Sequence, residues 1–182
     1  MNPFTLLGLP RQPYLTEEEI GTAYRKLAGE LHPDQPRGDA AAFRELGEAA
    51  AILRDPAQRL RELAGNNSGD QLPAAATDLF PHVATVLQQA DSLIEKYFLA
   101  SNALSKALLS APLKALALDL RATLSSVRTW RSSLEQELNH LDAAWPSIDG
   151  ISMNLLADCF AYAARWEREL RERELSLDSI LS

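Results

Sequence analysis

Residues 24–40, YRKLAGELHPDQPRGDA, decide how the N-terminal third of the chain folds. A helical pattern runs up to His32 and has to end there, because the residue before a proline is pushed out of the α-helical region. His32, Pro33 and Asp34 therefore stand together at the end of a helix. The triplet is either a simple helix stop or a group of side chains displayed for a purpose, and the surrounding sequence has to distinguish the two.

The helix that ends at this point is predicted to begin at Glu17. Thr16 and Glu19 have the spacing of a capping box, in which each side chain accepts a hydrogen bond from the other residue's backbone. Arg25 and Lys26 lie away from the apolar face and predict a basic, exposed surface. The apolar face itself has helical spacing and is expected in the core: Ile20, Tyr24, Leu27 and Leu31.

Three further helices are predicted around this one. A single turn over residues 4–7 follows Asn2, a third helix follows an N-cap at Asp39, and a short fourth helix follows Asp55 and ends before Gly65. The third helix carries its own apolar stripe of Phe43, Leu46, Ala50 and Leu53. The pattern predicts an all-α domain over residues 1–65, in which the second and third helices form an antiparallel hairpin.

The C-terminal part predicts a second helical domain. Residues 66–76, within and after the polar stretch GNNSGDQLP, are expected to be a linker, and residues 77–182 an antiparallel three-helix bundle with two long helices. Thr77 or Asp78 is the expected cap of a first helix of about 30 residues. A tight turn is expected at residues 110–112 and another at residues 144–150.

The leucines of residues 104–120 exceed what one buried face of a hairpin needs. Five of them suffice to show the excess: Leu108, Leu109, Leu113, Leu116 and Leu118. They can pack against the third helix or the N-terminal domain, or they can form a surface for a partner or a second copy. The sequence leaves these alternatives and the oligomeric state open.

Composition excludes several classes of function. With 46% hydrophobic and 24% charged residues, the 182-residue chain is typical of a soluble globular protein. Its net charge of −7, with no basic excess in either half, argues against nucleic acid. No apolar run approaches a membrane span and the N-terminus lacks signal-peptide features, so we expect a cytoplasmic protein. The single Cys159 and the absence of a phosphate loop or nucleophile–base motif predict no disulfide, no metal, no cofactor and no enzymatic activity.

The N-terminal motifs together resemble the J-domain of the DnaJ family of co-chaperones. YRKLA one turn before His-Pro-Asp, the two helices around the triplet, and LRDP followed by Arg59 carry the resemblance, which covers residues 2–65. It implies that His32, Pro33 and Asp34 trigger ATP hydrolysis in a DnaK-type chaperone. It also implies that Arg25 and Lys26 dock on that chaperone.

The sequence departs from the family pattern at three positions near the triplet. Gly29 and Glu30 stand where many members have helix-forming or basic residues, and Gln35 follows the triplet where lysine is common. Glu30 dilutes the positive face, so we expect weaker electrostatic steering than in a typical member.

The layout of the whole chain is similar to HscB-type co-chaperones of iron–sulfur cluster assembly. An extended stretch between the first two helices, a short linker and a C-terminal three-helix domain carry this second resemblance. It implies an HscA-type chaperone as partner and the cluster scaffold protein as client. A general J-protein with an unrelated client, and a J-like interaction protein that does not stimulate a chaperone, are the alternatives.

Overall fold

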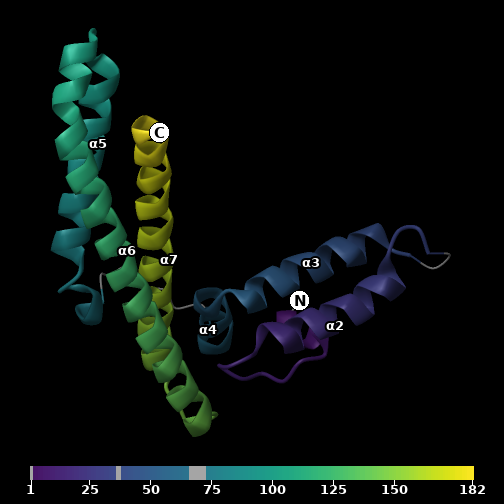
Figure 1. Cartoon of the computed structure of the whole chain (residues 1–182). Helices are drawn as coiled ribbons and strands as arrows, with labels where there is room; N and C mark the ends of the chain where they lie inside the picture. The colour runs from purple at the N-terminus through teal and green to yellow at the C-terminus, as the bar shows by residue number, and fades with distance from the viewer. Residues whose placement is uncertain (1, 36–37, 66–72) are drawn as a thin grey trace. The chain divides into compact units, whose positions relative to one another are not determined.

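The computed structural model of the chain is built of α-helices and describes residues 2–35, 38–65 and 73–182 (Figure 1). Within that part no strand occurs. The helices are α1 (Pro3–Leu7), α2 (Glu17–Leu31), α3 (Ala40–Arg54), α4 (Pro56–Ala64), α5 (Phe80–Leu99), α6 (Ala103–Ala144) and α7 (Gly150–Leu181), with a 3₁₀ turn at Ala74–Ala76. The all-α class, the four N-terminal helices and the C-terminal helical region are confirmed.

Local capping sets the ends of the N-terminal helices as the sequence predicted. The backbone N–H of Glu19 donates to Thr16 Oγ1, and the backbone N–H of Thr16 donates to the Glu19 carboxylate, at 3.2 and 2.7 Å. The bonds that the carboxylate accepts from Thr16 hold the pKa of Glu19 below its usual value. Asp39 and Asp55 accept bonds from the first turns of α3 and α4, at 2.8 and 2.9 Å.

The third helix is the centre of the N-terminal packing. α3 packs against α1, α2 and α4, and Figure 1 shows α2 and α3 side by side as a hairpin. Leu46 and Leu53 of α3 are fully buried, together with Ile20 of α2 and Leu60 of α4. The hairpin is thinner towards its loop, where Phe43 and the other predicted core residues Tyr24, Leu27 and Leu31 are half-buried.

The predicted boundary between the first two C-terminal helices is wrong. The connection between α5 and α6 lies at residues 100–102, where Asn102 Oδ1 accepts a 2.8 Å bond from the N–H of Ser105. Pro112, at the predicted turn, lies inside α6. α5 begins at Phe80 without a side-chain cap, so neither Thr77 nor Asp78 has the predicted role. A proline inside a helix costs about 3 kcal/mol, and the burial of neighbouring leucines (Leu113, Leu116 and Leu120) offsets this cost.

The chain forms two compact units, and these units are not contiguous in sequence. One combines Met1–Gln71 with Leu134–Phe160, and the other combines Leu72–Ser133 with Ala161–Ser182. Inside the first unit, Arg61 and Asp158 form an ion pair of 2.8 Å. Residues 66–72 of the predicted linker lie outside the described residues, and the domain limits 1–65 and 77–182 stay a prediction.

The second unit has its own apolar core. Helices α5, α6 and α7 contribute to it, and Trp166 packs against Phe80, Trp130 and Tyr162 with ring centroids 5.6–6.2 Å apart. None of the described helices is long and apolar enough to cross a membrane.

Two glycines allow a direct test of helix energetics in the first unit. A Cβ added at Gly29 or at Gly8 meets no atom within 4 Å, but Gly8 has φ +66° and Gly29 lies in the middle of an exposed helical turn. Gly29→Ala should raise the free energy of unfolding by about 0.5–1 kcal/mol, because alanine loses less backbone entropy. Gly8→Ala should lower it by about 1–2 kcal/mol, because the left-handed conformation strains an L-residue. Urea denaturation measures both, and a Gly29→Ala variant no more stable than the parent would contradict the expectation.

Candidate functional site

A turn at the end of α2 carries the His-Pro-Asp triplet. The carbonyl of His32 accepts a 2.9 Å bond from the N–H of Gln35, with Pro33 and Asp34 in the two central positions. Proline suits the first of these positions because its ring fixes φ. The N–H of Asp39 donates to the Leu31 carbonyl at 3.1 Å. The turn is therefore attached at both ends, to the end of α2 and to the start of α3.

The backbone of Gly38 lies directly against the carbonyl of His32. A Cβ at this position would overlap the carbonyl oxygen of His32 and would lie 3.0 Å from the Cα of Pro33. Only glycine leaves room for this close backbone approach. Sequence reasoning missed this role of Gly38. A glycine next to a turn was the available signal, but the distance to His32 is a property of the folded loop.

The imidazole of His32 is held from two sides and remains accessible. Its ring meets the edge of the Phe43 ring at 5.4 Å, and Nδ1 accepts a 3.3 Å bond from the N–H of Asp34. The side chain is 47% exposed and that of Asp34 is 89% exposed. The Asp34 carboxylate lies 3.5 Å from the same nitrogen. In the tautomer whose Nδ1 accepts the Asp34 N–H, Nε2 carries the proton and can donate to a partner. Phe43, predicted only as a core residue, also orients this ring.

The basic face predicted on α2 is present. Arg25 and Lys26 are both exposed, and Arg25 donates a 3.1 Å hydrogen bond to Thr22 Oγ1 one turn earlier. His32 follows Lys26 by six residues, or about 9 Å along a helix. Arg25 and Lys26 thus lie on the exposed side of α2, within about two helical turns of the loop that carries Asp34.

Arg59 has a structural role that its place after the LRDP motif did not reveal. The residue is only 3% exposed. Its guanidinium donates to the carbonyls of Pro13, at 2.7 Å, and of Leu53. Burial lowers the pKa of Arg59, against the opposing effect of Asp55. The side chain joins the segment before α2 to the end of α3, and this holds the hairpin in place.

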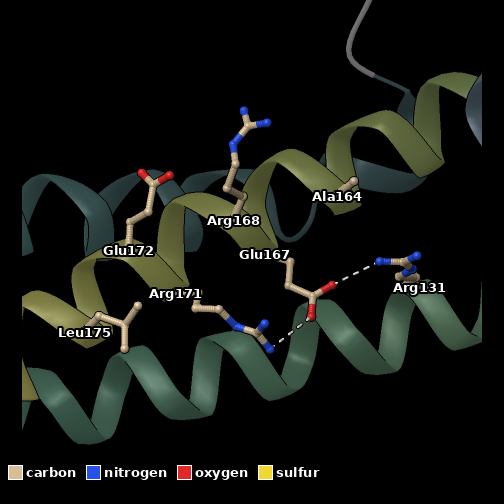
Figure 2. Close-up of a pocket in the computed structure, with 7 residues that line it drawn as sticks. All are labelled: Arg131, Ala164, Glu167, Arg168, Arg171, Glu172 and Leu175. Carbon is tan, nitrogen blue, oxygen red and sulfur yellow. Dashed lines mark hydrogen bonds and ion pairs between the residues drawn. The ribbon is translucent and has the colours of Figure 1, made fainter. Parts of the chain in front are cut away.

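A groove on the second unit contains a paired cluster of charges (Figure 2). Glu167 lies between Arg131 and Arg171, at 3.1 and 4.0 Å, and also accepts a 3.0 Å bond from Arg128. Burial acts to raise the pKa of Glu167, but the hydrogen bonds from Arg128 and Arg131 outweigh it and lower the pKa. Arg168 and Glu172 point away from this pair in the view. The cluster joins α6 to α7 through ion pairs of Glu167 with arginines of both helices.

The other titratable groups of the described part of the chain bear on two kinds of site, a metal site and a nucleophilic thiol. Among the described residues, no three His, Cys, Asp or Glu side chains are placed to hold a metal ion. Cys159 is buried, and burial, with the nearby Glu137 and Asp158, raises the pKa of its thiol to about 11. A thiol of this kind stays protonated at neutral pH and packs as a small apolar side chain.

Comparison with known proteins assigns the first part of the chain. Residues 2–61 match the family model described as the DnaJ domain. The protein SIS1 of Saccharomyces cerevisiae is 45% identical over 56 residues, and the chaperone protein DnaJ of Hyphomonas neptunium is 49% identical over 59. Each alignment covers 31% of this chain and 15% of the relative. Residues 2–61 are therefore a DnaJ domain, as predicted.

A solved structure matches almost the whole chain. Chaperone HscB from Vibrio cholerae superposes with a TM-score of 0.54, covering 97% of this chain and 99% of that one, at 19% sequence identity. At this identity the similarity shows the fold. The predicted HscB-like layout, a J-domain followed by a helical C-terminal region, is confirmed.

The contact between Gly38 and His32 predicts a local effect of mutation. Gly38→Ala should displace the turn, because the new Cβ cannot share space with the His32 carbonyl. We expect NMR shifts of the His32 ring and the Gln35 amide to change, with the melting temperature lowered by no more than a few degrees. Gly47→Ala in α3 is the control, since its Cβ would meet no atom within 4 Å. Unchanged His32 and Gln35 shifts in Gly38→Ala would contradict the predicted displacement.

Proposed function

We propose that this protein is a co-chaperone that stimulates ATP hydrolysis by a DnaK- or HscA-type chaperone. The observation that carries the proposal is the exposed His32-Pro33-Asp34 turn at the end of α2, within a DnaJ domain. The matched relatives named DnaJ are chaperone proteins, but this chain covers only about a fifth of their length or less. Stimulation of a chaperone is accordingly our inference for this protein.

The geometry suits a group that acts by binding rather than by chemistry of its own. Pro33 and the hydrogen bonds of the turn fix the backbone beforehand, so little conformational entropy is lost when a partner binds. The Asp34 carboxylate can form a charge-assisted hydrogen bond to a cation on the chaperone, and His32 Nε2–H can donate a second bond. Arg25 and Lys26 would increase the rate of encounter with an acidic surface more than the final affinity.

Substitution of His32 tests the proposal. His32→Gln should reduce stimulation of the chaperone's ATPase at least about tenfold, because replacing a residue at the centre of an interface commonly weakens binding by this much. The fold should be unaffected, since the ring is half-exposed and lies outside the core. Single-turnover ATP hydrolysis by a DnaK-type chaperone is the measurement, with circular dichroism as the check on folding.

The chain offers a matched control for this experiment. His140 is exposed and lies on α6, away from the J-domain hairpin in sequence, so His140→Gln makes the same chemical change elsewhere. It should stimulate as the parent does. Equal stimulation by His32→Gln and by the parent would contradict the proposal. If the parent itself did not stimulate the chaperone, the alternative of a J-like interaction protein would be supported instead.

We further propose that the C-terminal helices carry the client, with the iron–sulfur cluster scaffold as the first candidate. The support is the match over 97% of this chain to Chaperone HscB, because it extends through the C-terminal helices and is not confined to the J-domain. A general J-protein of the DnaJ type would instead bind unfolded substrates.

A binding experiment separates these two clients. The full-length protein should retain purified scaffold protein in a pull-down, and should not suppress aggregation of a chemically unfolded model substrate. Because His32 belongs to the chaperone-facing turn, His32→Gln should bind the scaffold as well as the parent does. Absence of scaffold binding together with suppression of aggregation would favour the general J-protein.

A further inference from the structure

Helix α6 is apolar on two opposite faces over its first half. One face carries Leu113, Leu116, Leu120 and Leu124 into the core of the second unit, where each is at most 5% exposed. The opposite face carries Leu104, Leu108 and Leu118, which are 72%, 71% and 67% exposed. A helix that is apolar all round is normally buried on all sides. The outward leucines are therefore unexplained by the fold of one chain.

The outward residues follow a heptad pattern. Leu104, Leu108, Ala111, Ala115, Leu118 and Ala122 are separated by four, three, four, three and four residues, and all six are exposed. We call these six residues the outer stripe. It extends about 27 Å along the helix. Alternation of three and four is the spacing of the contact positions in a two-stranded coiled coil, whereas a single buried helix face tolerates looser spacing.

The charges beside the outer stripe indicate which helix would cover it. Lys114 and Asp119 lie on opposite flanks of the stripe, at the positions called g and e when Leu108 is assigned to a. In a parallel pair, residue g of one helix meets residue e five positions later on the other helix. The separation from 114 to 119 is five, so two copies of α6 would form two Lys114–Asp119 ion pairs.

The two residues remain available for such contacts. Lys114 is exposed and forms no ion pair within the described part of the chain. Asp119 is 44% exposed in its side chain, and its only ion-pair neighbour among the described residues is His82, at 3.6 Å. An antiparallel pairing that overlays the outer stripe on itself would instead bring the two Lys114 side chains together, which is unfavourable.

We propose that the outer stripe is a homodimer interface in which two copies of α6 pack in parallel. The three leucines would supply the apolar contact, and Ala111 and Ala115 would let the helix backbones approach closely. Dimerisation would remove six leucine side chains from water, three from each chain. The entropy lost when two chains associate opposes this gain. We therefore expect a dissociation constant in the micromolar range. The inference concerns residues outside the J-domain and does not depend on the proposed function.

Sedimentation velocity on the full-length protein, from about 1 to 200 µM, tests the dimer. The parent should convert from monomer to dimer within this range, and Leu108→Glu should weaken dimerisation at least about tenfold. Leu175→Glu is the matched control, because Leu175 is 65% exposed on α7, outside the outer stripe, and should leave dimerisation unchanged. A parent that is still a monomer at the highest concentration would overturn the proposal. Binding of the outer stripe to anionic lipid vesicles or to an acidic helical peptide by such a monomer would point to a different occupant and would not rescue the dimer.

Charge reversal tests the register. Lys114→Glu alone should weaken the dimer about threefold to tenfold, and adding Asp119→Lys should restore most of the loss by re-forming the pair with reversed signs. An antiparallel dimer predicts little change for Lys114→Glu, because both copies change together and one like-charge repulsion replaces another. Dimerisation by Lys114→Glu as tight as that of the parent would therefore overturn the parallel arrangement.

Cross-linking tests the orientation independently. In a parallel pair Ala111 faces its own counterpart, so two Ala111→Cys chains should form a disulfide when oxidised glutathione accepts their two electrons and two protons. Ala84→Cys, an exposed position on α5, is the control and should not cross-link at a comparable rate. Equal rates for the two variants would overturn the proposed orientation.

Discussion

The conformation of the turn at residues 32–35 depends on the backbone carbonyl of His32. This carbonyl accepts the N–H of Gln35 and lies directly against Gly38, at the point where Pro33 ends α2. A helix end normally leaves such carbonyls to water or to a capping residue. Here one carbonyl fixes the turn instead, and the side chains of His32 and Asp34 are left exposed. The polar groups of the site are thus oriented by the backbone before any partner arrives.

The rest of the J-domain supports this turn from a distance. α3 provides the core through Leu46 and Leu53, and Arg59 joins the end of α3 to the segment before α2. A buried arginine is stabilising only when it is well hydrogen-bonded, and here Nε and Nη1 donate to the carbonyls of Pro13 and Leu53. Packing is dense at the α4 end of the hairpin and thinner near the loop. This gradient leaves the His32–Asp34 turn on the least buried part of the hairpin, where we propose that the chaperone binds.

The core of the second unit is filled by only some of the apolar residues of its helices, and others remain exposed. The inward leucines of α6 explain why Pro112 is tolerated inside the helix. The outward leucines of the outer stripe contribute nothing to that core. Their heptad spacing and flanking charges have a simple physical explanation in a second helix, and association of two chains would place two J-domains in one assembly.

The sequence by itself determined the N-terminal helices and the triplet, because these depend on local chemistry. Thr16, Asp39 and Asp55 cap the helices whose starts they predicted, and Pro33 ends α2 at the predicted residue. The tertiary structure alone decided the rest. The end of α5 was missed because Pro112 is locally a stronger break than Asn102, and only burial of Leu113 and Leu116 reverses that preference. The roles of Gly38, Phe43 and Arg59 depend on contacts between segments that capping and periodicity do not describe.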